Sequence, residues 1–212
     1  MKRSVFVVIV ALLTGITMQA RELEVIKLNA PDKTKGDAMM KVFGERQSIR
    51  EYAQRELTPQ DLSDLLWATN GINRPDGKRT APTARNVQDV DVYVAMKEGV
   101  YLYDAKEHAL KPVSAGDYRE AVGGSQDFVK EAPVSLLLVT DLSRLGDASS
   151  EQAKLMGAVD VGIVCQNINL ACAGLGLATV PRATMDQETL RKALKLKESQ
   201  LLLMNNPVGY PR

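Results

Sequence analysis

Histidine and cysteine are scarce in this chain of 212 residues, which has one histidine and two cysteines. The single histidine, His108, excludes a histidine-rich metal site, and nothing around it suggests a Ser-His-Asp arrangement, so we expect it on the surface. The cysteines, Cys165 and Cys172, are two helical turns apart in one apolar segment. That separation is too large for a disulfide, and it predicts two buried thiols on one helix face.

The chain also lacks a large net charge and the common nucleotide-binding motifs. It has 27 basic and 26 acidic residues, which argues against nucleic acid or an acidic polymer as its partner. No Gly-x-Gly-x-x-Gly follows a strand-like run, and no Gly-x-x-x-x-Gly-Lys occurs. A chain without a metal site or an activated nucleophile needs a borrowed cofactor for difficult chemistry.

The first twenty residues have the pattern of a secretory signal peptide. Lys2 and Arg3 form a positive start, residues 5–16 are an uncharged apolar run, and Ala20 offers a small residue at a cleavage point. The run is short for a membrane span, so we expect cleavage, export and a periplasmic mature protein. An uncleaved N-terminal anchor is the alternative. Cleavage removes two basic residues and leaves 25 against 26 acidic ones.

Four helices are predicted in the rest of the chain, the first of them at the end of an N-terminal arm over residues 21–43. Thr58 is a good N-cap and Pro59 fits the first helical position, so one helix should begin there and end near Gly71. Apolar residues repeating at three and four positions predict the longest helix over residues 149–173. A short capped helix is expected over residues 184–196.

Alternating and continuous apolar runs predict the strands. Residues 90–94 alternate apolar with polar side chains, and residues 100–103 read as the returning arm of a hairpin. The apolar run at residues 134–139 is typical of a strand buried on both faces, and residues 201–204 read as a final strand. Together with the helices, these strands predict one α+β domain over residues 21–212.

Residues 46–50 read Arg-Gln-Ser-Ile-Arg. The planar guanidinium fork makes two parallel hydrogen bonds to phosphate oxygens, and the Ser48 hydroxyl between Arg46 and Arg50 adds a further contact. The pattern therefore favours a phosphate-binding segment. The alternative is a solvated surface turn whose charges form ordinary ion pairs of small energy.

The stretch Arg46-Gln47-Ser48-Ile49-Arg50 resembles the Arg-x-Ser-x-Arg/Lys motif of the nitroreductase family of flavin enzymes. Four further stretches follow in the family's order, and the match runs from about residue 42 to the C-terminus. A Trp-Ala-x-x-Gly-Ile-Asn-Arg signature is similar to the branch of oxidases that modify azoline peptides. The four stretches are residues 66–74, 80–86, 166–171 and 174–177.

This resemblance implies a three-layer α+β sandwich, with a central, mostly antiparallel sheet flanked by helices. It also implies a homodimer that forms through the long helix and holds one FMN in each of two sites at the subunit interface. NAD(P)H is the candidate reductant. No catalytic acid or base is assigned, because the flavin carries the reaction.

Roles for single residues follow from the same resemblance. Arg46 and Ser48 would bind the FMN phosphate, with Gln47 beside them. Arg50 would lie near the pyrimidine edge of the ring, where a cation stabilises the charge of the reduced flavin. The other expected flavin contacts are Pro82, Thr83, Ala84 and Asn86 from the partner subunit, Gln126 near the ring, the backbone of Pro181, Arg182, Ala183 and Thr184, and Arg212.

Two departures from the family pattern lead to alternatives. Residues 182–184 stand where other members often carry glycines, so their side chains should narrow the space above the ring. The chain ends where longer members continue with a basic tail, so Arg212 reaches the phosphate only if the terminus folds back. Gln126 as an ordinary loop amide and Asn86 as a turn residue are the simpler interpretations of those positions.

The expected function is that of an FMN-dependent oxidoreductase, which passes a hydride from a donor such as NAD(P)H to a small nitroaromatic-like or quinone-like acceptor. A single site that donor and acceptor occupy in turn predicts ping-pong kinetics. Export complicates the choice of donor, because an exported protein would meet little NAD(P)H. The alternatives are a flavin-dependent dehydrogenase or oxidase of a small molecule or peptide, and a flavin-binding protein without turnover, which the crowding at residues 182–184 favours.

Overall fold

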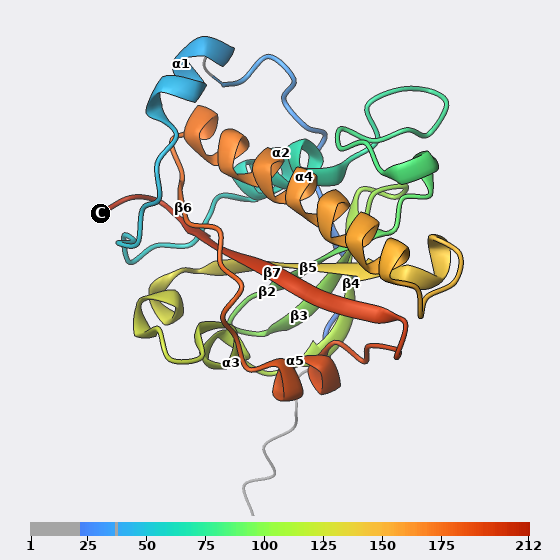
Figure 1. Ribbon diagram of the computed structural model, residues 1–212. Helices are drawn as coiled ribbons and strands as arrows, with labels where there is room; N and C mark the ends of the chain where they lie inside the picture. The colour runs from blue at the N-terminus through green and yellow to red at the C-terminus, as the bar shows by residue number, and fades with distance from the viewer. Residues whose placement is uncertain (1–21, 37) are drawn as a thin grey trace, which may run out of the picture.

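The computed structural model of this chain describes residues 22–36 and 38–212, and the predicted signal peptide lies outside them. A seven-stranded sheet runs through the middle of the molecule (Figure 1). The strands are β1 (Ile26–Lys27), β2 (Val90–Ala95), β3 (Gly99–Asp104), β4 (Ala109–Ala115), β5 (Val134–Asp141), β6 (Ala178–Thr179) and β7 (Gln200–Gly209). Their order across the sheet is β1-β4-β3-β2-β5-β7-β6, and each described neighbouring pair is antiparallel, which confirms the predicted sheet.

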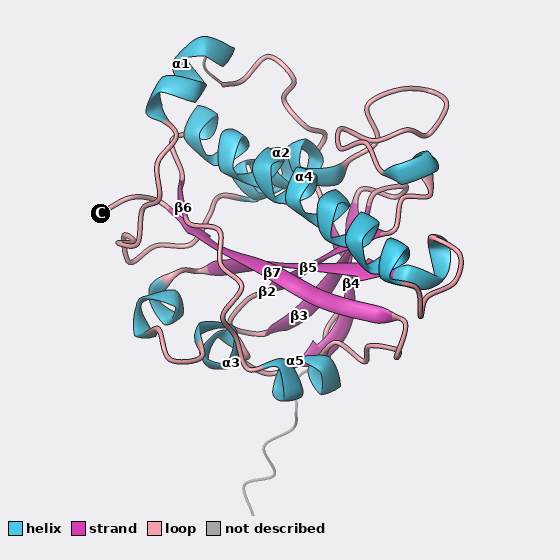
Figure 2. Cartoon of the chain, viewed as in Figure 1, coloured by secondary structure: helices cyan, strands magenta, loops and turns pink. Residues whose placement is uncertain are grey.

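Helices cover both faces of this sheet and give the molecule three layers (Figure 2). The α-helices are α1 (Met39–Glu45), α2 (Pro59–Asn70), α3 (Arg119–Gly123), α4 (Glu151–Leu175) and α5 (Gln187–Ala193), and the short 3-10 turns are η1 (Ala84–Asn86), η2 (Asp127–Glu131) and η3 (Leu142–Arg144). The helices α2 and α4 lie on one face, while α3 and α5 lie on the other. The predicted three-layer α+β sandwich is therefore confirmed.

Strand β5 shows why the sheet needs a helical layer on each side. Leu136 and Leu138 pack in the hydrophobic cluster under α2 and α4, whereas Leu137 and Val139 pack in a second cluster with Leu190 of α5. All eight residues of β5 are buried. Because alternate side chains point to opposite faces of a strand, the continuous apolar run is explained by a core on both sides.

The helix boundaries follow the capping residues that the sequence indicates. Thr58 Oγ1 accepts a hydrogen bond from the backbone N–H of Asp61 at 3.0 Å, and Pro59 is the first residue of α2. Ser150 caps α4 in the same way, and Gly176 ends that helix in the left-handed conformation, with φ of 69°. Helix α4 therefore begins and ends two residues later than predicted.

Strand β4 is the longest element that sequence reasoning missed. Pro112 interrupts its pattern, and proline cannot donate a hydrogen bond to a ladder. The strand forms because Pro112 lies beside a register shift between Val100 and Tyr101 of β3. On its other side, β1 pairs only with Ala109 and Leu110. A proline near the edge of a sheet is thus accommodated where the pairing is already irregular or absent.

The single histidine corrects the expectation of a surface residue. The His108 ring is half-buried, with one nitrogen 2.8 Å from Ser63 Oγ of α2 and the other 2.9 Å from the Tyr103 hydroxyl of β3. Burial lowers the pKa of His108. The ring thus joins the turn after β3 to α2, so its role is to pack the two layers together.

The two cysteines are free and buried, as predicted. Cys165 Sγ donates to Asn206 Oδ1 at 3.2 Å, and burial raises the pKa of the Cys165 thiol to about 11. A thiol with a raised pKa carries little thiolate at neutral pH and is a poor nucleophile. Both cysteines therefore act as parts of the core.

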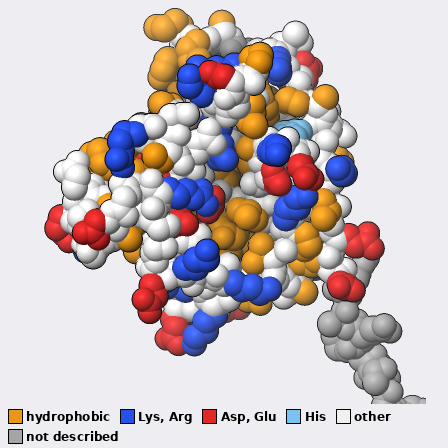
Figure 3. All heavy atoms as spheres, turned by 90° about the vertical axis from the view of Figure 1, so that its right-hand side faces the viewer, with side chains coloured by type: hydrophobic (Ala, Val, Ile, Leu, Met, Phe, Trp, Pro, Cys, Tyr) orange, Lys and Arg blue, Asp and Glu red, His pale blue; other side chains and the backbone are white. Residues whose placement is uncertain are grey.

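Charged side chains of both signs are interspersed over the face shown in Figure 3. Hydrophobic side chains gather between them near the middle of that face. The composition has nearly equal numbers of basic and acidic residues, and on this side of the molecule the two signs are also mixed in space.

Candidate functional site

Residues 46–50 form an irregular segment that is fixed at both ends by backbone hydrogen bonds. The N–H of Arg46 donates to Val42 O at the end of α1, at 2.9 Å. The N–H of Ile49 donates to Thr179 O of β6, also at 2.9 Å. These bonds hold the backbone beside the edge of the sheet, and Arg46 is half-buried there. The side chains that stay exposed are those of Gln47, Ser48 and Arg50.

A cavity of about 490 Å³ opens beside this segment, between α1, the end of α4 and the C-terminus. Within residues 22–36 and 38–212, the guanidinium groups of Arg46 and Arg50 have no ion pair or hydrogen bond to the protein. Other arginines do have such partners, for example Arg119 with Asp117 at 2.6 Å. An unpaired guanidinium is available to an anion. The cavity is lined by Gly44, Glu45, Arg46, Gln47, Ile49, Ala173, Gly176, Leu177 and Pro211.

The predicted backbone segment at residues 181–184 lies on the same side of the sheet. Arg182 N–H donates to Asn205 O of β7 at 2.9 Å, and Asn205 N–H donates back to Arg182 O at 2.7 Å. The segment starts two residues after Thr179, which holds Ile49. Two stretches that are distant in sequence, residues 46–50 and 181–184, are thus brought to one edge of the sheet by β6.

The Arg182 side chain corrects the expectation that it crowds the space above this segment. Only 7% of the residue is exposed, and its guanidinium points into the protein. It donates to Val122 O at 3.0 Å, to Gly123 O at 2.9 Å and to Asn205 Oδ1 at 2.6 Å. Burial lowers the pKa of Arg182. The side chain therefore holds the end of α3 against β7 and leaves the outer side to Ala183 and Thr184, which are exposed.

Two other predicted site residues also have partners within the chain. Gln126 Oε1 accepts a hydrogen bond from Arg182 Nε at 2.7 Å, which places this amide beside residues 181–184. The C-terminus folds back, because Pro211 forms an antiparallel bridge with Tyr52. The Arg212 guanidinium, however, forms an ion pair with Glu131 at 3.1 Å. Arg212 is thus close in chain to the cavity but is already paired.

The loop at residues 82–86 is not brought to this place within one chain. Ala84 N–H donates to Asp160 Oδ2 of α4 at 2.8 Å, whereas the cavity beside Arg46 reaches Ala173 near the other end of α4. Thirteen residues of α-helix separate those two positions, or about 20 Å along the axis. Pro82, Thr83 and Asn86 line a separate cavity of about 350 Å³. The two predicted regions, residues 46–50 and residues 82–86, therefore lie apart within one chain, and each is called a candidate half-site below.

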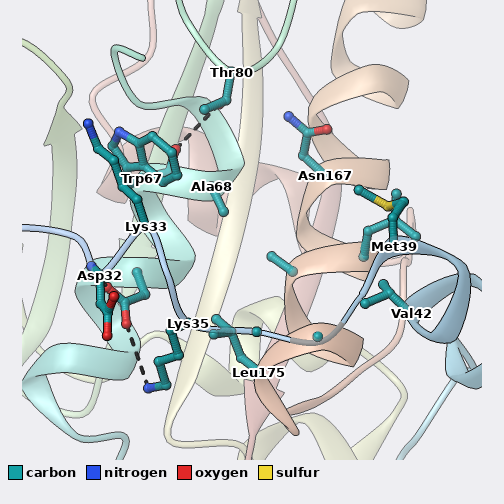
Figure 4. Close-up of a pocket in the computed structure, with 15 residues that line it drawn as sticks. Asp32, Lys33, Lys35, Met39, Val42, Trp67, Ala68, Thr80, Asn167 and Leu175 are labelled. Carbon is teal, nitrogen blue, oxygen red and sulfur yellow. Dashed lines mark hydrogen bonds and ion pairs between the residues drawn. The ribbon is translucent and has the colours of Figure 1, made fainter.

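A further cavity, of about 320 Å³, lies between residues 32–42, α2 and α4 (Figure 4). Trp67 faces it from α2, and Met39 and Val42 face it from the side of α1. Its charges are already engaged, since Lys35 lies 3.6 Å from Asp64 and also pairs with Asp61. None of the predicted site residues lines this cavity.

Comparison with known proteins agrees with the motifs and with this geometry. The model of the nitroreductase family matches residues 44–210. The chain belongs to the nitroreductase family. Its membership makes it an oxidoreductase.

Relatives of this nitroreductase-family chain include proteins from archaea and bacteria. A protein of Methanocaldococcus jannaschii named "putative nitroreductase" is 31% identical over 206 residues, covering 92% of this chain and 98% of the relative. The FMN reductase [NAD(P)H] of Bacillus subtilis is 27% identical over 82% of this chain and 66% of its own length. A crystal structure from Ralstonia eutropha JMP134, also titled a nitroreductase, is 35% identical, with a TM-score of 0.82 over 89% of this chain and 90% of that one.

Sequence reasoning missed three buried groups behind the 82–86 loop of this nitroreductase-family chain. Asp160 receives the Ala84 N–H, and Asp89 Oδ2 accepts from the Thr140 hydroxyl at 2.6 Å. A signal for Asp160 was present, since it is the single charged residue between Lys154 and Arg182. No local pattern reveals Asp89 or Thr140, because their contact joins strands far apart in sequence.

The arrangement favours binding and orientation of a flavin rather than acid–base chemistry by the protein. The half-site at residues 46–50 offers guanidinium and hydroxyl donors, which suit a phosphate. Among the residues that the structure describes, no group of three or more His, Cys, Asp or Glu is placed to hold a metal ion. The candidate half-site at residues 82–86 offers backbone and side-chain polar groups from a loop that contacts α4 at Asp160.

Proposed function

We propose that this nitroreductase-family chain is an FMN-dependent oxidoreductase in which Arg46 and Ser48 hold the FMN phosphate. The observation that carries the proposal is a pair of guanidinium groups without a partner among the described residues. Arg46 lines the cavity of about 490 Å³, and Arg50 follows four residues later. Positive side chains are normally paired when acids are at hand, as Arg119 and Arg144 are here. A donor set left free at the edge of the fold fits a phosphate group.

When bound, FMN supplies hydride acceptance and electron transfer, so the protein contributes position and charge. Arg50 stands four residues from Arg46, at the other end of the same segment. We infer that its charge stabilises the negative charge that the ring carries when reduced. The backbone of residues 181–184, held in place by Arg182, would form the wall facing the ring.

A homodimer through α4 completes the site in this proposal. Leu155 and Val159 are 56% and 46% exposed, and they share one helix face with Gly162 and Gln166. Helix α4 is also long and apolar enough to span a membrane by length and composition, with 44% of the span buried inside the fold. A second copy of α4 is the partner whose chemistry matches this uncovered apolar face.

The positions of the two half-sites determine how the two copies of α4 must lie. The 82–86 loop sits at Asp160, and the phosphate half-site sits at Ala173. The loop of one chain reaches the half-site of the other only if the two helices run antiparallel. The two-fold axis then passes near the midpoint of these positions, beside Gln166, which is exposed.

Donor, acceptor and location remain part of the proposal. NAD(P)H is the donor we favour, because one relative is named an FMN reductase [NAD(P)H]. The predicted export to the periplasm favours the alternative, a flavin-dependent dehydrogenase or oxidase of a small molecule or peptide, as in the azoline-oxidase-like branch. The third candidate, a flavin-binding protein without turnover, loses the contribution of Arg182, whose side chain points inward, and keeps that of the exposed Ala183 and Thr184.

Binding of FMN to purified variants tests the proposal. Arg46→Ala should weaken FMN binding at least about tenfold, because a charge-assisted hydrogen bond contributes about 1.5–3 kcal/mol. Arg50→Ala should mainly lower the reduction potential of the bound flavin. Lys192→Ala, which removes an exposed charge on α5, is the matched control and should change neither value. Unchanged affinity and potential in both arginine variants would contradict the proposed site.

Anaerobic mixing of the flavin-loaded protein with NADH or NADPH tests turnover. Bleaching of the flavin absorbance by either nucleotide supports the reductase, and parallel double-reciprocal plots with a quinone acceptor support alternation at one site. Bleaching only by another reduced compound favours the dehydrogenase alternative. A protein that bleaches with no donor has a binding role only, and one that takes up no FMN overturns the proposal.

A further inference from the structure

Two buried carboxyl groups lie behind the 82–86 loop. Asp89 is 0% exposed and Asp160 is 3% exposed. Asp160 Oδ2 accepts the Ala84 N–H at 2.8 Å, and Asp89 Oδ2 accepts the Thr140 hydroxyl at 2.6 Å. These bonds satisfy one oxygen of each carboxyl group and leave the second oxygen of each to be explained.

The second oxygen of Asp89 has no hydrogen-bond partner among the described residues, although it is buried. The side chain of Asp160 interacts with that of Asp89. Burial raises the pKa of Asp160 to about 6, the Ala84 amide opposes the rise, and the hydrogen bond and charge of Asp89 add to it. Ionisation of both of two adjacent buried carboxyl groups is unfavourable, so we assign a proton to Asp160. That proton supplies the hydrogen-bond donor that the second oxygen of Asp89 lacks.

The loop that this pair supports has an unfavourable backbone. Arg85, Asn86 and Gln88 have φ values of 53°, 56° and 54°. Residues other than glycine rarely adopt these backbone angles. Such a conformation persists only where contacts with the surrounding structure hold it in place. Two of the restraints are the Ala84–Asp160 bond and the bond from Gln88 N–H to Thr83 Oγ1, at 2.9 Å. The buried carboxyl pair is thus a fixed anchor for a strained loop.

We propose that Asp160 and Asp89 share one proton and together hold the 82–86 loop in the conformation that it presents to a ligand. Asp160 is therefore a positioning residue, which acts through the backbone of Ala84 and does not touch the ligand itself. Where that ligand is FMN bound by a second subunit, the inference rests on the proposed function. The anchoring of the loop within one chain does not.

Charged groups on the neighbouring elements favour one position for the proton. Arg144 of η3 interacts with the charge of Asp89, and it also pairs with Asp91 at 3.0 Å and with Asp141 at 3.7 Å. Arg85, in the loop itself, donates to Leu145 O. No cation is among the groups that shift the pKa of Asp160, and that pKa is raised, so we assign the shared proton to Asp160.

The first test is the melting temperature of the apoprotein between pH 4 and pH 8. The raised pKa of Asp160 means that its stabilising contribution is complete below about pH 4 and is lost as the pH rises to about 6. Asp160→Asn keeps an acceptor for Ala84 and offers a permanent N–H to Asp89. Its melting temperature should therefore gain about 5 °C on the wild type between pH 4 and pH 7.5.

Glu198→Gln, an exposed carboxyl-to-amide change, is the matched control and should follow the wild type at every pH. Parallel melting curves for the wild type and Asp160→Asn would overturn the shared proton.

The second test follows the loop by hydrogen exchange of backbone amides. Asp160→Ala removes the acceptor, so the amide of Ala84 should exchange at least tenfold faster, while amides of β2 keep their protection. Asp160→Asn should leave the Ala84 amide as protected as in the wild type. Unchanged exchange in Asp160→Ala would overturn the positioning role, and a protein too unstable to measure is replaced by Asp160→Ser in the same comparison.

FMN affinity separates this inference from the proposed function. The wild type should bind FMN several-fold more weakly at pH 8 than at pH 5.5, whereas Asp160→Asn should show a flat profile. Another outcome is that the melting and exchange results appear as expected while FMN affinity changes neither with pH nor with substitution of Asp160. In that case the anchoring of the loop is correct, and the assignment of the loop to a flavin site is wrong. If FMN binds and responds to Arg46→Ala but not to Asp160→Ala, the positioning role is wrong.

Discussion

Two glycines on α4, five residues apart, show how differently the two faces of this helix are used. A Cβ added to Gly157 would lie 2.6 Å from Thr140 Oγ1 and 3.0 Å from Leu142 Cδ2. A Cβ added to Gly162 would meet nothing within 4 Å. The inner face is thus packed until no side chain fits, while the outer face is apolar and uncovered. Gly157 is therefore required for the fold of a single chain, whereas Gly162 is available for association with a second chain.

Placing a side chain at Gly157 should give the largest effect on stability. Gly157→Val would force α4 away from β5 and disturb Thr140, whose hydroxyl is bonded to Asp89. We expect a loss of about 3 kcal/mol or more in the free energy of unfolding, measured by urea denaturation. Gly162→Val is the matched control, and with both variants made in the monomeric Val159→Lys background it should cost well under half as much. Equal losses at the two positions would show that the two faces are not different.

A charge on the outer face should act on assembly and leave the fold intact. Val159→Lys should weaken the dimer at least about a hundredfold, because an unpaired ammonium in an apolar interface costs about 3 kcal/mol. Sedimentation velocity measures this shift to monomer, and FMN affinity should fall with it. Ala115→Lys, an exposed change at the end of β4, is the control and should remain dimeric.

Cross-linking sharpens the same prediction. Gln166→Cys places a thiol beside the expected two-fold axis, so mild oxidation should give a disulfide-linked dimer in high yield. The native Cys165 and Cys172 are buried and should not interfere. A monomer that does not cross-link, or a dimer unaffected by Val159→Lys, would place the interface elsewhere.

The sequence predicted those features that depend on neighbours along the chain. Thr58 and Pro59 mark the start of α2, and the apolar run of β5 reports burial on two faces, because each signal is local. The order of the motifs also indicated the family correctly. The motif at residues 46–50 is also a local signal, and its assignment to the FMN phosphate stays a prediction.

Features that depend on distant neighbours could not be predicted. Arg182 was expected to face outward, and nothing beside it in sequence announces the carbonyls of Val122 and Gly123 that bind it. The contact of Asp89 with Asp160 brings together residues that are 71 positions apart, and no spacing rule relates them. Strand β4 was missed because Pro112 is acceptable only beside a register shift that forms in the folded sheet.

Gly162→Ala should give the smallest effect, and it should stabilise the monomer but weaken the dimer. These opposite signs separate the role of the outer face of α4 in one chain from its role in the interface. In a chain made monomeric by Val159→Lys, Gly162→Ala should raise the free energy of unfolding by about 0.5–1 kcal/mol, because alanine is the better helix former at an exposed position. In the otherwise unaltered chain, the added methyl group should hold the two copies of α4 apart and weaken the dimer. Urea denaturation of the monomer and sedimentation of the dimer measure the two effects. A gain in both would mean that Gly162 faces solvent in the assembled protein, and a loss in the monomer would mean that its surroundings are not open.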